Sequence, residues 1–282
     1  MVKRIIVALD PSEYSRKALD ASIWLALQHE AELTGICVLD IPGIESSLGS
    51  VPLGASYYAR ELSQVRIKQA ETRIKDLLEN FDKKCSEAEV KFKSYKVQGL
   101  PSSEIINAAK YYDVLIIGKR TYFGLESLDS EGNSFDEILD YSITPIIAIP
   151  KEFEINTYKL KNRKVLVAFD GSLPSCRALQ RWSQLAVSGS IEVKLVMSGK
   201  DTDYRDHSLD EAEELLNAHG LMNIVKFGTE MDIKDVINQE VLDDYDVIVI
   251  GAHSKSSLIR FFTGSFTNYV INKSKNLIFI GQ

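Results

Sequence analysis

The residues best suited to chemistry follow an apolar run, residues 247–250, near the C-terminal end of the sequence. They read Gly251-Ala252-His253-Ser254 and then, after nine residues, Gly264-Ser265-Phe266. A glycine at a strand end lets a ligand approach the backbone. A Gly-Ser pair at a helix start offers backbone N–H groups, a hydroxyl and the positive end of the helix dipole, a combination that suits a phosphate group. The alternative is structural, with Gly251 ending a strand and Ser265 capping a helix.

Other chemistries are less well supported by the residue pattern. Asp10 and Asp170 lack a second acid or a histidine at a catalytic spacing, so a role in anchoring a turn is favoured over catalysis. His253 lies inside the phosphate-type loop, where it could contact a phosphate or be an ordinary loop residue. The sequence has no P-loop, no GxGxxG fingerprint and no histidine or cysteine spacing typical of a metal site. We predict no catalytic residue and no bound metal.

These residues belong to a chain that contains an internal repeat. Residues 4–12 (RIIVALDPS) recur as residues 164–172 (KVLVAFDGS), and residues 112–118 (YDVLIIG) recur as residues 245–251 (YDVIVIG). The conserved order of the matches indicates a duplication, with about 27 extra residues in the first half. We expect the extra residues within residues 41–82. There, residues 42–58 are rich in Pro, Gly and Ser, and we predict that they form no regular helix until their end.

Each half alternates short apolar runs with amphipathic stretches. Strands are expected at residues 4–9, 33–39, 90–97, 114–117 and 146–149, and again at 165–169, 191–197, 223–227, 247–250 and 277–280. Continuous apolar runs indicate strands buried on both faces, and the intervening helices indicate right-handed crossovers. The predicted fold class is α/β, with two tandem doubly wound domains, each a five-stranded, mainly parallel sheet with helices on both faces. Ligands bind such sheets beyond the carboxyl ends of the strands, where the strand order reverses.

The repeat also sets the predicted domain boundaries. The first domain is expected to cover residues 1–150 and the second residues 164–282. The charged residues 151–163 between them are expected to form a linker or an edge.

With these motifs the chain resembles a tandem universal stress protein, and two copies of that family's domain would cover nearly all of it. The family's phosphate motif is a glycine, two residues, a second glycine, nine residues and then Gly-Ser or Gly-Thr. Here Gly251, Ser254, Gly264 and Ser265 occupy these positions, with Ser254 in place of the second glycine. The resemblance implies that an adenine nucleotide (ATP, ADP or AMP) binds to the second half. The contacts implied are Asp170, Gly171, Val196, Gly251, His253, Ser254, Gly264, Ser265 and Phe266.

The first half departs further from the family pattern. Asp10, Val38 and Gly118 match it, but Thr121 replaces the second glycine and Asn133 the third. The same loop carries Glu126, Asp129 and Glu131, whose carboxylates would repel a phosphate. We therefore predict a degenerate first site, in which an adenosine-type ligand without phosphate could still fit.

The resemblance also implies an arrangement of the two halves. The two halves of a tandem chain would resemble a dimer of single-domain family members, in which the last strand is often at the interface. We therefore expect the halves to pair about a pseudo-two-fold axis, with residues 146–149 and 277–280 paired or close together. We also expect the whole chain to form a homodimer.

Composition limits the classes of partner and the compartment. The 282 residues carry a net charge of −7, with 45% hydrophobic and 26% charged residues, which is typical of a globular protein. This balance disfavours a broad surface for nucleic acid or for an anionic membrane. No apolar run approaches the roughly 18 residues of a membrane helix, and the first residues do not read as a signal peptide. Three scattered cysteines disfavour a disulfide framework, so we predict a cytoplasmic protein.

Together these observations favour a stress-response binding or regulatory module that binds an adenine nucleotide mainly in its second domain and acts on an unidentified protein partner. A nucleotide-independent scaffold is the alternative, favoured by Ser254 and by the acidic first loop. A slow ATPase is a third hypothesis, disfavoured because no general base or magnesium ligand is evident.

Overall fold

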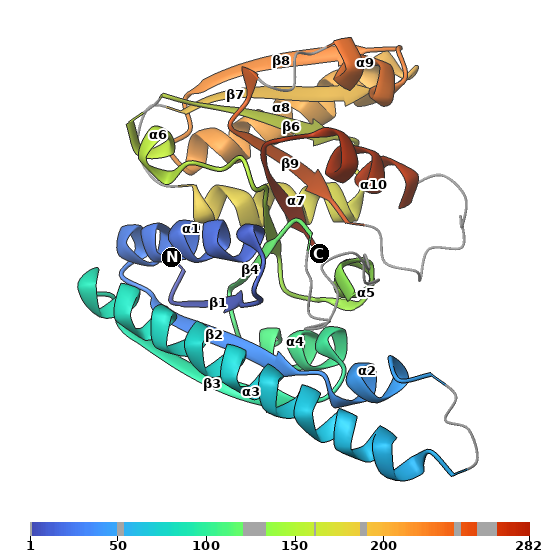
Figure 1. Ribbon diagram of the computed structural model, residues 1–282. Coiled ribbons are helices and arrows are strands. Elements are labelled where there is room, and N and C mark those ends of the chain that lie inside the picture. The colour runs from blue at the N-terminus through green and yellow to red at the C-terminus, as the bar shows by residue number, and fades with distance from the viewer. Residues whose placement is uncertain are drawn as a thin grey trace. The chain divides into compact units, whose positions relative to one another are not determined.

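The computed structural model describes residues 2–49, 54–120, 134–160, 162–186, 191–239, 244–252 and 264–282. The chain forms two compact units, of which the first holds Lys3–Ser142 and the second holds Ile143–Gln282 (Figure 1). The predicted α/β class is confirmed, because helices alternate with mainly parallel strands and each half of the sequence contributes five of the strands described.

The first unit is built around four parallel strands in the order β3-β2-β1-β4. The strands are β1 (Arg4–Ala8), β2 (Glu32–Leu39), β3 (Phe92–Gln98) and β4 (Val114–Gly118). Its helices are α1 (Glu13–His29), α2 (Ile41–Ser46), α3 (Ser56–Glu87), α4 (Pro101–Ala109) and α5 (Ser134–Tyr141). Because β1 has β2 on one side and β4 on the other, the strand order reverses at β1, although the strands themselves run parallel. Right-handed crossovers then put α1 and α3 on one face and α4 on the other.

The extra residues of the first half lie where they were predicted, between the second and third strands, but their structure differs from the prediction. α2 forms at the start of residues 42–58, so the expectation of no helix before the end of this segment was wrong. The Asp40 carboxylate caps α2 by accepting the N–H of Gly43 at 2.8 Å, and Pro42 fits the first turn, where its missing N–H costs nothing. α3 is 32 residues long, against 17 for α8 (Thr202–Ala218) in the second half.

The second unit holds six strands in the order β5-β10-β9-β6-β7-β8. They are β5 (Ile146–Ile149), β6 (Arg163–Phe169), β7 (Ile191–Ser198), β8 (Asn223–Thr229), β9 (Val247–Gly251) and β10 (Leu277–Gly281). The helices, besides α8, are α6 (Ile155–Leu160), α7 (Leu173–Leu185), α9 (Ile233–Gln239) and α10 (Gly264–Lys273). α6 falls within the predicted linker, which is therefore partly helical. The boundaries 150 and 164 themselves stay predictions.

β5 and β10 are the two apolar runs that were expected to meet. They pair antiparallel, with Phe279 opposite Ile147 and Ile280 opposite Ile146, so this pairing is confirmed. β5 comes from the first half of the sequence but belongs to the compact unit that holds the second half. The other strand pairs of this unit are parallel.

The continuous apolar strands form the cores of the two units. Every residue of β4 is buried, as are the first four residues of β9, which is what coverage on both faces requires. β3 and β8 lie at the outer end of each strand order and are mostly exposed or half-buried. Among the residues that the structure describes, no helix combines the length and the apolar character needed to cross a membrane.

Candidate functional site

A cavity of about 250 Å³ opens at the carboxyl ends of β6, β7 and β9 in the second unit. β6 lies between β7 and β9, so this is the point where the strand order reverses and where ligands bind in such sheets. The lining residues are Ala168, Phe169, Asp170, Ser172, Ser175, Ser198, Asp232, Ile233, Gly251 and Phe266. Three residues that the sequence singled out, Asp170, Gly251 and Phe266, thus line one cavity.

The turn from β6 into α7 positions the Asp170 carboxylate. Its Oδ1 accepts the backbone N–H of Ser172 at 2.9 Å, and Ser172 is the N-cap of α7. In the first half, Asp10 accepts the N–H of Ser12 in the same way, at 2.7 Å. Both aspartates therefore anchor a turn at a helix start. They differ in exposure, because Asp10 is only 3% exposed whereas Asp170 is exposed and lines the cavity.

Two other predicted contacts lie beside the cavity but do not line it. Gly171 has a φ of 71°, and a Cβ built on it would come within 2.4 Å of the Tyr204 hydroxyl of α8. The left-handed conformation favours glycine here, whereas the Tyr204 hydroxyl is the end of an exposed side chain that could move aside. Val196 of β7 is only 1% exposed and packs in the core. The residue of β7 that does reach the cavity is Ser198, two positions further along the strand.

Gly251 has a packing role that the sequence did not reveal. A Cβ at this position would lie 2.7 Å from the backbone nitrogen of Ser175 and 2.8 Å from the carbonyl carbon of Pro174, both in the first turn of α7. Gly118 makes the same kind of approach in the first half, where a Cβ would lie 2.6 Å from Cβ of Tyr14. The glycine at the end of each of these strands is thus explained by the helix that packs against it.

The remaining predicted contacts divide into two groups. Gly264 and Ser265 open α10, so the predicted Gly-Ser pair does stand at a helix start, one residue before Phe266. His253 and Ser254 lie outside the described residues, as do Thr121 and Asn133 of the first half.

Sequence reasoning missed the third side of the cavity, which comes from the connection between β8 and α9. Asp232 and Ile233 line the cavity there. The Asp232 Oδ1 accepts the N–H of Lys234 at 2.8 Å, in the first turn of α9. The Ser198 hydroxyl donates to the carbonyl of Met231 and so joins the end of β7 to this connection. The available signal was position, since these residues also follow a parallel strand.

The described lining of the cavity is acidic and rich in hydroxyls. It holds the carboxylates of Asp170 and Asp232 and the hydroxyls of Ser172, Ser175 and Ser198, and none of the described lining residues is basic. Such a lining suits hydrogen-bond donors, for example the hydroxyls of a sugar or an exocyclic amine. In the described part of the chain, no three His, Cys, Asp or Glu side chains gather closely enough to hold a metal ion.

Cys176 lies next to the cavity, in the first turn of α7. Its Sγ is 3.7 Å from the carbonyl oxygen of Gly171. Burial, with a smaller contribution from the nearby Asp170 charge, raises the pKa of this thiol above its usual value of 9.0. The thiol therefore stays protonated at neutral pH, and the geometry gives no activated nucleophile here.

Comparison with known proteins settles the family. The family model described as universal stress protein family matches residues 1–128 and again residues 161–277. The chain belongs to the universal stress protein family. The match covers most of both halves, so the chain is a tandem member with two family domains.

Relatives match this universal stress protein over its full length or over about half of it. Universal stress protein Slr1230 of Synechocystis sp. is 23% identical over 97% of both chains. Universal stress protein YxiE of Bacillus subtilis is 29% identical over 53% of this chain and 99% of its own length, as expected for a single-domain relative. A crystal structure of a universal stress protein from Archaeoglobus fulgidus covers 99% of this chain and 98% of its own, with 20% identity and a TM-score of 0.69.

A ligand is named for one of the similar solved structures. It is a universal stress protein in complex with cAMP, 22% identical, which covers 43% of this chain and 96% of its own, with a TM-score of 0.37.

Proposed function

We propose that this protein is a cytoplasmic stress-response module that binds an adenine nucleotide in its second half and acts as a regulatory binding protein, with at most slow ATP hydrolysis. The observation that carries the proposal is the cavity at the carboxyl ends of β6, β7 and β9, lined by Asp170, Gly251 and Phe266. The sequence pattern alone points to these three residues, which lie far apart along the chain. Their convergence at the point of strand reversal supports a ligand site.

The chemistry of the lining suggests how the ligand would lie. Asp170 and Asp232 repel a phosphate but accept hydrogen bonds from ribose hydroxyls or from an adenine amine. The nucleoside would therefore occupy the described cavity. The phosphates would extend toward the start of α10 at Gly264, where backbone N–H groups and the helix dipole favour an anion.

The difference between the two aspartates supports placing the ligand in the second half. The Asp10 carboxylate is 3% exposed, so it is available to its own turn rather than to a ligand. Asp170 makes the same turn and is exposed to the cavity. Substitution by asparagine keeps an oxygen that can accept the turn hydrogen bond and removes only the charge, so the two positions form a matched pair.

The test is calorimetric titration of the full chain with adenosine and with ATP. We expect one site per chain for both ligands. Asp170→Asn should weaken adenosine binding by about fivefold, because a hydrogen bond to a charged acceptor is stronger than one to a neutral acceptor by about 1 kcal/mol. Asp10→Asn should leave the affinity for adenosine unchanged. If Asp10→Asn loses binding and Asp170→Asn does not, the ligand binds in the first half and our assignment is wrong. If neither ligand produces heat at millimolar concentration, nucleotide binding is refuted.

A second candidate function, protein interaction without nucleotide, is favoured by one surface. The first turns of α3 carry Tyr57, Tyr58, Leu62 and Val65, which are 65%, 74%, 46% and 52% exposed. Large apolar side chains gathered on one exposed segment mark interaction sites in many proteins. We suggest this segment as a contact for a second copy of the chain or for another protein. The double variant Tyr58→Ser and Leu62→Ser should then sediment more slowly than the wild type, with a sedimentation coefficient nearer that of the monomer, alone or with its partner. An unchanged sedimentation coefficient would show that this segment makes no such contact.

A further inference from the structure

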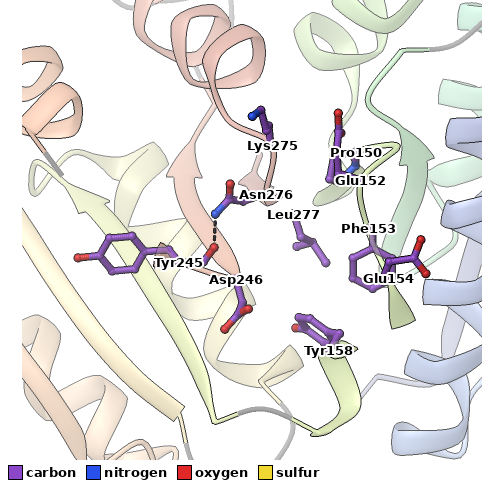
Figure 2. A pocket seen from close by; sticks show the side chains of 10 residues that line it. All are labelled: Pro150, Glu152, Phe153, Glu154, Tyr158, Tyr245, Asp246, Lys275, Asn276 and Leu277. Atoms are coloured by element: carbon purple, nitrogen blue, oxygen red, sulfur yellow. Dashed lines mark hydrogen bonds between the residues drawn. The ribbon is translucent and has the colours of Figure 1, made fainter. Parts of the chain in front are cut away.

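A second cavity, of about 360 Å³, lies at the opposite edge of the sheet of the second unit, near the amino ends of β6, β9 and β10 (Figure 2). Its existence follows from the path of the chain between the two halves. β5 runs antiparallel to β10, so the chain leaves β5 at Pro150 beside the start of β10. It then forms α6 and begins β6 at Arg163, next to the residues that precede β9. The connecting segment and the strand ends together line the cavity.

One wall of this cavity is aromatic and apolar. Phe153 is 7% exposed, and its ring centroid lies 5.3 Å from that of the half-buried Tyr158. Leu277, the first residue of β10, is 9% exposed and lies near Phe153 in Figure 2. A volume of this size falls within the range of sites for small organic molecules, which bury an apolar body against such walls. The wall thus offers a place for the body of a ligand.

Opposite this wall, polar groups converge around Asp246. The Asp246 Oδ2 accepts the backbone N–H of Lys164 at 2.9 Å, while Oδ1 has no hydrogen-bond partner among the described residues. The Tyr158 hydroxyl points toward Asp246 (Figure 2). Burial raises the pKa of the Tyr158 phenol, the charge and hydrogen bond of Arg163 lower it, and the Asp246 charge raises it further. One carboxylate oxygen is therefore available to a donor inside the cavity.

The charges that line the cavity favour a cation. The lining includes three carboxylates, those of Glu152, Glu154 and Asp246, and one ammonium group, that of Lys275. The Glu152 carboxylate has Lys151 at 3.9 Å. Arg163, just outside the lining, is held over the Tyr158 ring with its guanidinium carbon 5.7 Å from the centroid. The lining itself is thus net negative, and aromatic faces attract cations as well.

We propose that this cavity binds a small organic cation, an ammonium group on an aromatic or aliphatic body. The ammonium group donates to the Asp246 Oδ1, and the body packs against Phe153, Tyr158 and Leu277. A ligand seated there contacts both the connecting segment and the strand ends of the second unit. The site is separate from the nucleotide cavity, since it lies at the amino rather than the carboxyl ends of the strands.

The test is a ligand-observed NMR titration of the full chain with four probes of similar shape. They are phenethylamine, the neutral phenethyl alcohol, the anionic phenylpropionate and the zwitterionic phenylalanine. We expect phenethylamine to bind in the millimolar range and the alcohol and phenylpropionate to bind at least about threefold more weakly, since only the amine gains the charge interaction. Equal binding of amine and alcohol would overturn the proposal, as would a higher affinity for phenylalanine or no binding by any probe.

Two variants locate the site and separate it from the nucleotide proposal. Asp246→Asn keeps an acceptor for the Lys164 N–H and should weaken the amine by about threefold or more. The matched control is Asp113→Asn, because Asp113 accepts the N–H groups of Lys3 and Arg4 in the equivalent place of the first half. Lys275→Gln removes a repulsive charge and should strengthen amine binding. Equal losses in Asp246→Asn and Asp113→Asn, or weaker binding in Lys275→Gln, would overturn the assignment, whatever the adenosine titrations give.

Discussion

Replacing Gly251 by alanine tests whether this glycine serves the ligand or the fold. The family motif implies that Gly251 leaves room for a nucleotide. In the structure the room is taken by α7, because a Cβ would lie 2.7 Å from the Ser175 nitrogen and 2.8 Å from the Pro174 carbonyl carbon. Both are backbone atoms in a helical turn, so neither can rotate away as the end of a flexible side chain would. The helix must shift by several tenths of an ångström.

The expected loss of stability follows from two opposing effects. Overpacking of this kind costs about 1–3 kcal/mol. Alanine also restricts the unfolded chain, which returns about 0.4–1 kcal/mol. We therefore expect Gly251→Ala to lower the free energy of unfolding of the second unit by about 1–2 kcal/mol. Gly199→Ala is the matched control, since no atom lies within 4 Å of its added Cβ and its φ is not in the left-handed region. It should change the stability by less than about 0.5 kcal/mol.

Urea unfolding can be followed in the second unit alone. The chain has two tryptophans, Trp24 in α1 of the first unit and Trp182 in α7 of the second. In a Trp24→Phe background, the fluorescence reports on Trp182, which is 6% exposed in the helix that Gly251 contacts. If Gly251→Ala unfolds at the same urea concentration as its parent but loses adenosine binding, the packing argument is refuted and the glycine serves the ligand.

Three further outcomes are expected. Asp232→Asn should weaken adenosine binding by about threefold, because it removes a charged acceptor for the nucleoside, and should weaken ATP binding less, because it also removes a charge that repels the phosphates. Asp201→Asn, at the cap of α8, should change neither affinity in the same calorimetric titrations. The hydrogen bond from Lys93 lowers the pKa of Glu32 below 4.5. The ion pair of Glu32 with Lys93 therefore stabilises the fold at neutral pH, and this contribution is lost as the pH falls through the lowered pKa. Glu32→Gln should lower the free energy of unfolding in urea by less than about 1 kcal/mol at pH 7 and leave it unchanged in acid. Burial raises the pKa of Cys37 and of Cys85 to about 12, so both thiols should react very slowly with iodoacetamide in the native protein. Mass spectrometry after this treatment should find both unmodified, and the half-buried Cys176 modified first.

Much of the fold could be predicted because buried parallel strands have a simple sequence pattern. Residues 114–117 and 247–250 are uninterrupted apolar runs, and both proved to be central, buried strands. The repeat then assigned equivalent places to Asp10 and Asp170, which make the same hydrogen bond to the residue two positions on. Local pattern and chain order were sufficient for these features.

Features that depend on contacts distant in sequence could not be predicted. The reason for glycine at position 251 is the approach of Pro174 and Ser175, which no local pattern reveals. Asp232 was missed because the recognised motifs follow the first and fourth strands of each half, whereas the third strand of the second half also ends at the cavity. α2 was missed because its composition argues against a helix, and a single cap by Asp40 is enough to start one.

The pairing of β5 with β10 has a consequence for the order of synthesis. Ala148 pairs with Ile278, a residue translated about 130 positions later. Until then, one edge of β5 lacks its neighbour, although the strand itself has already left the ribosome. Exposed strand edges recruit other chains, so this interval is the stage at which the nascent protein is most prone to aggregate or to exchange strands with a second copy. Pausing late in translation should therefore lower the yield of native protein more than pausing early.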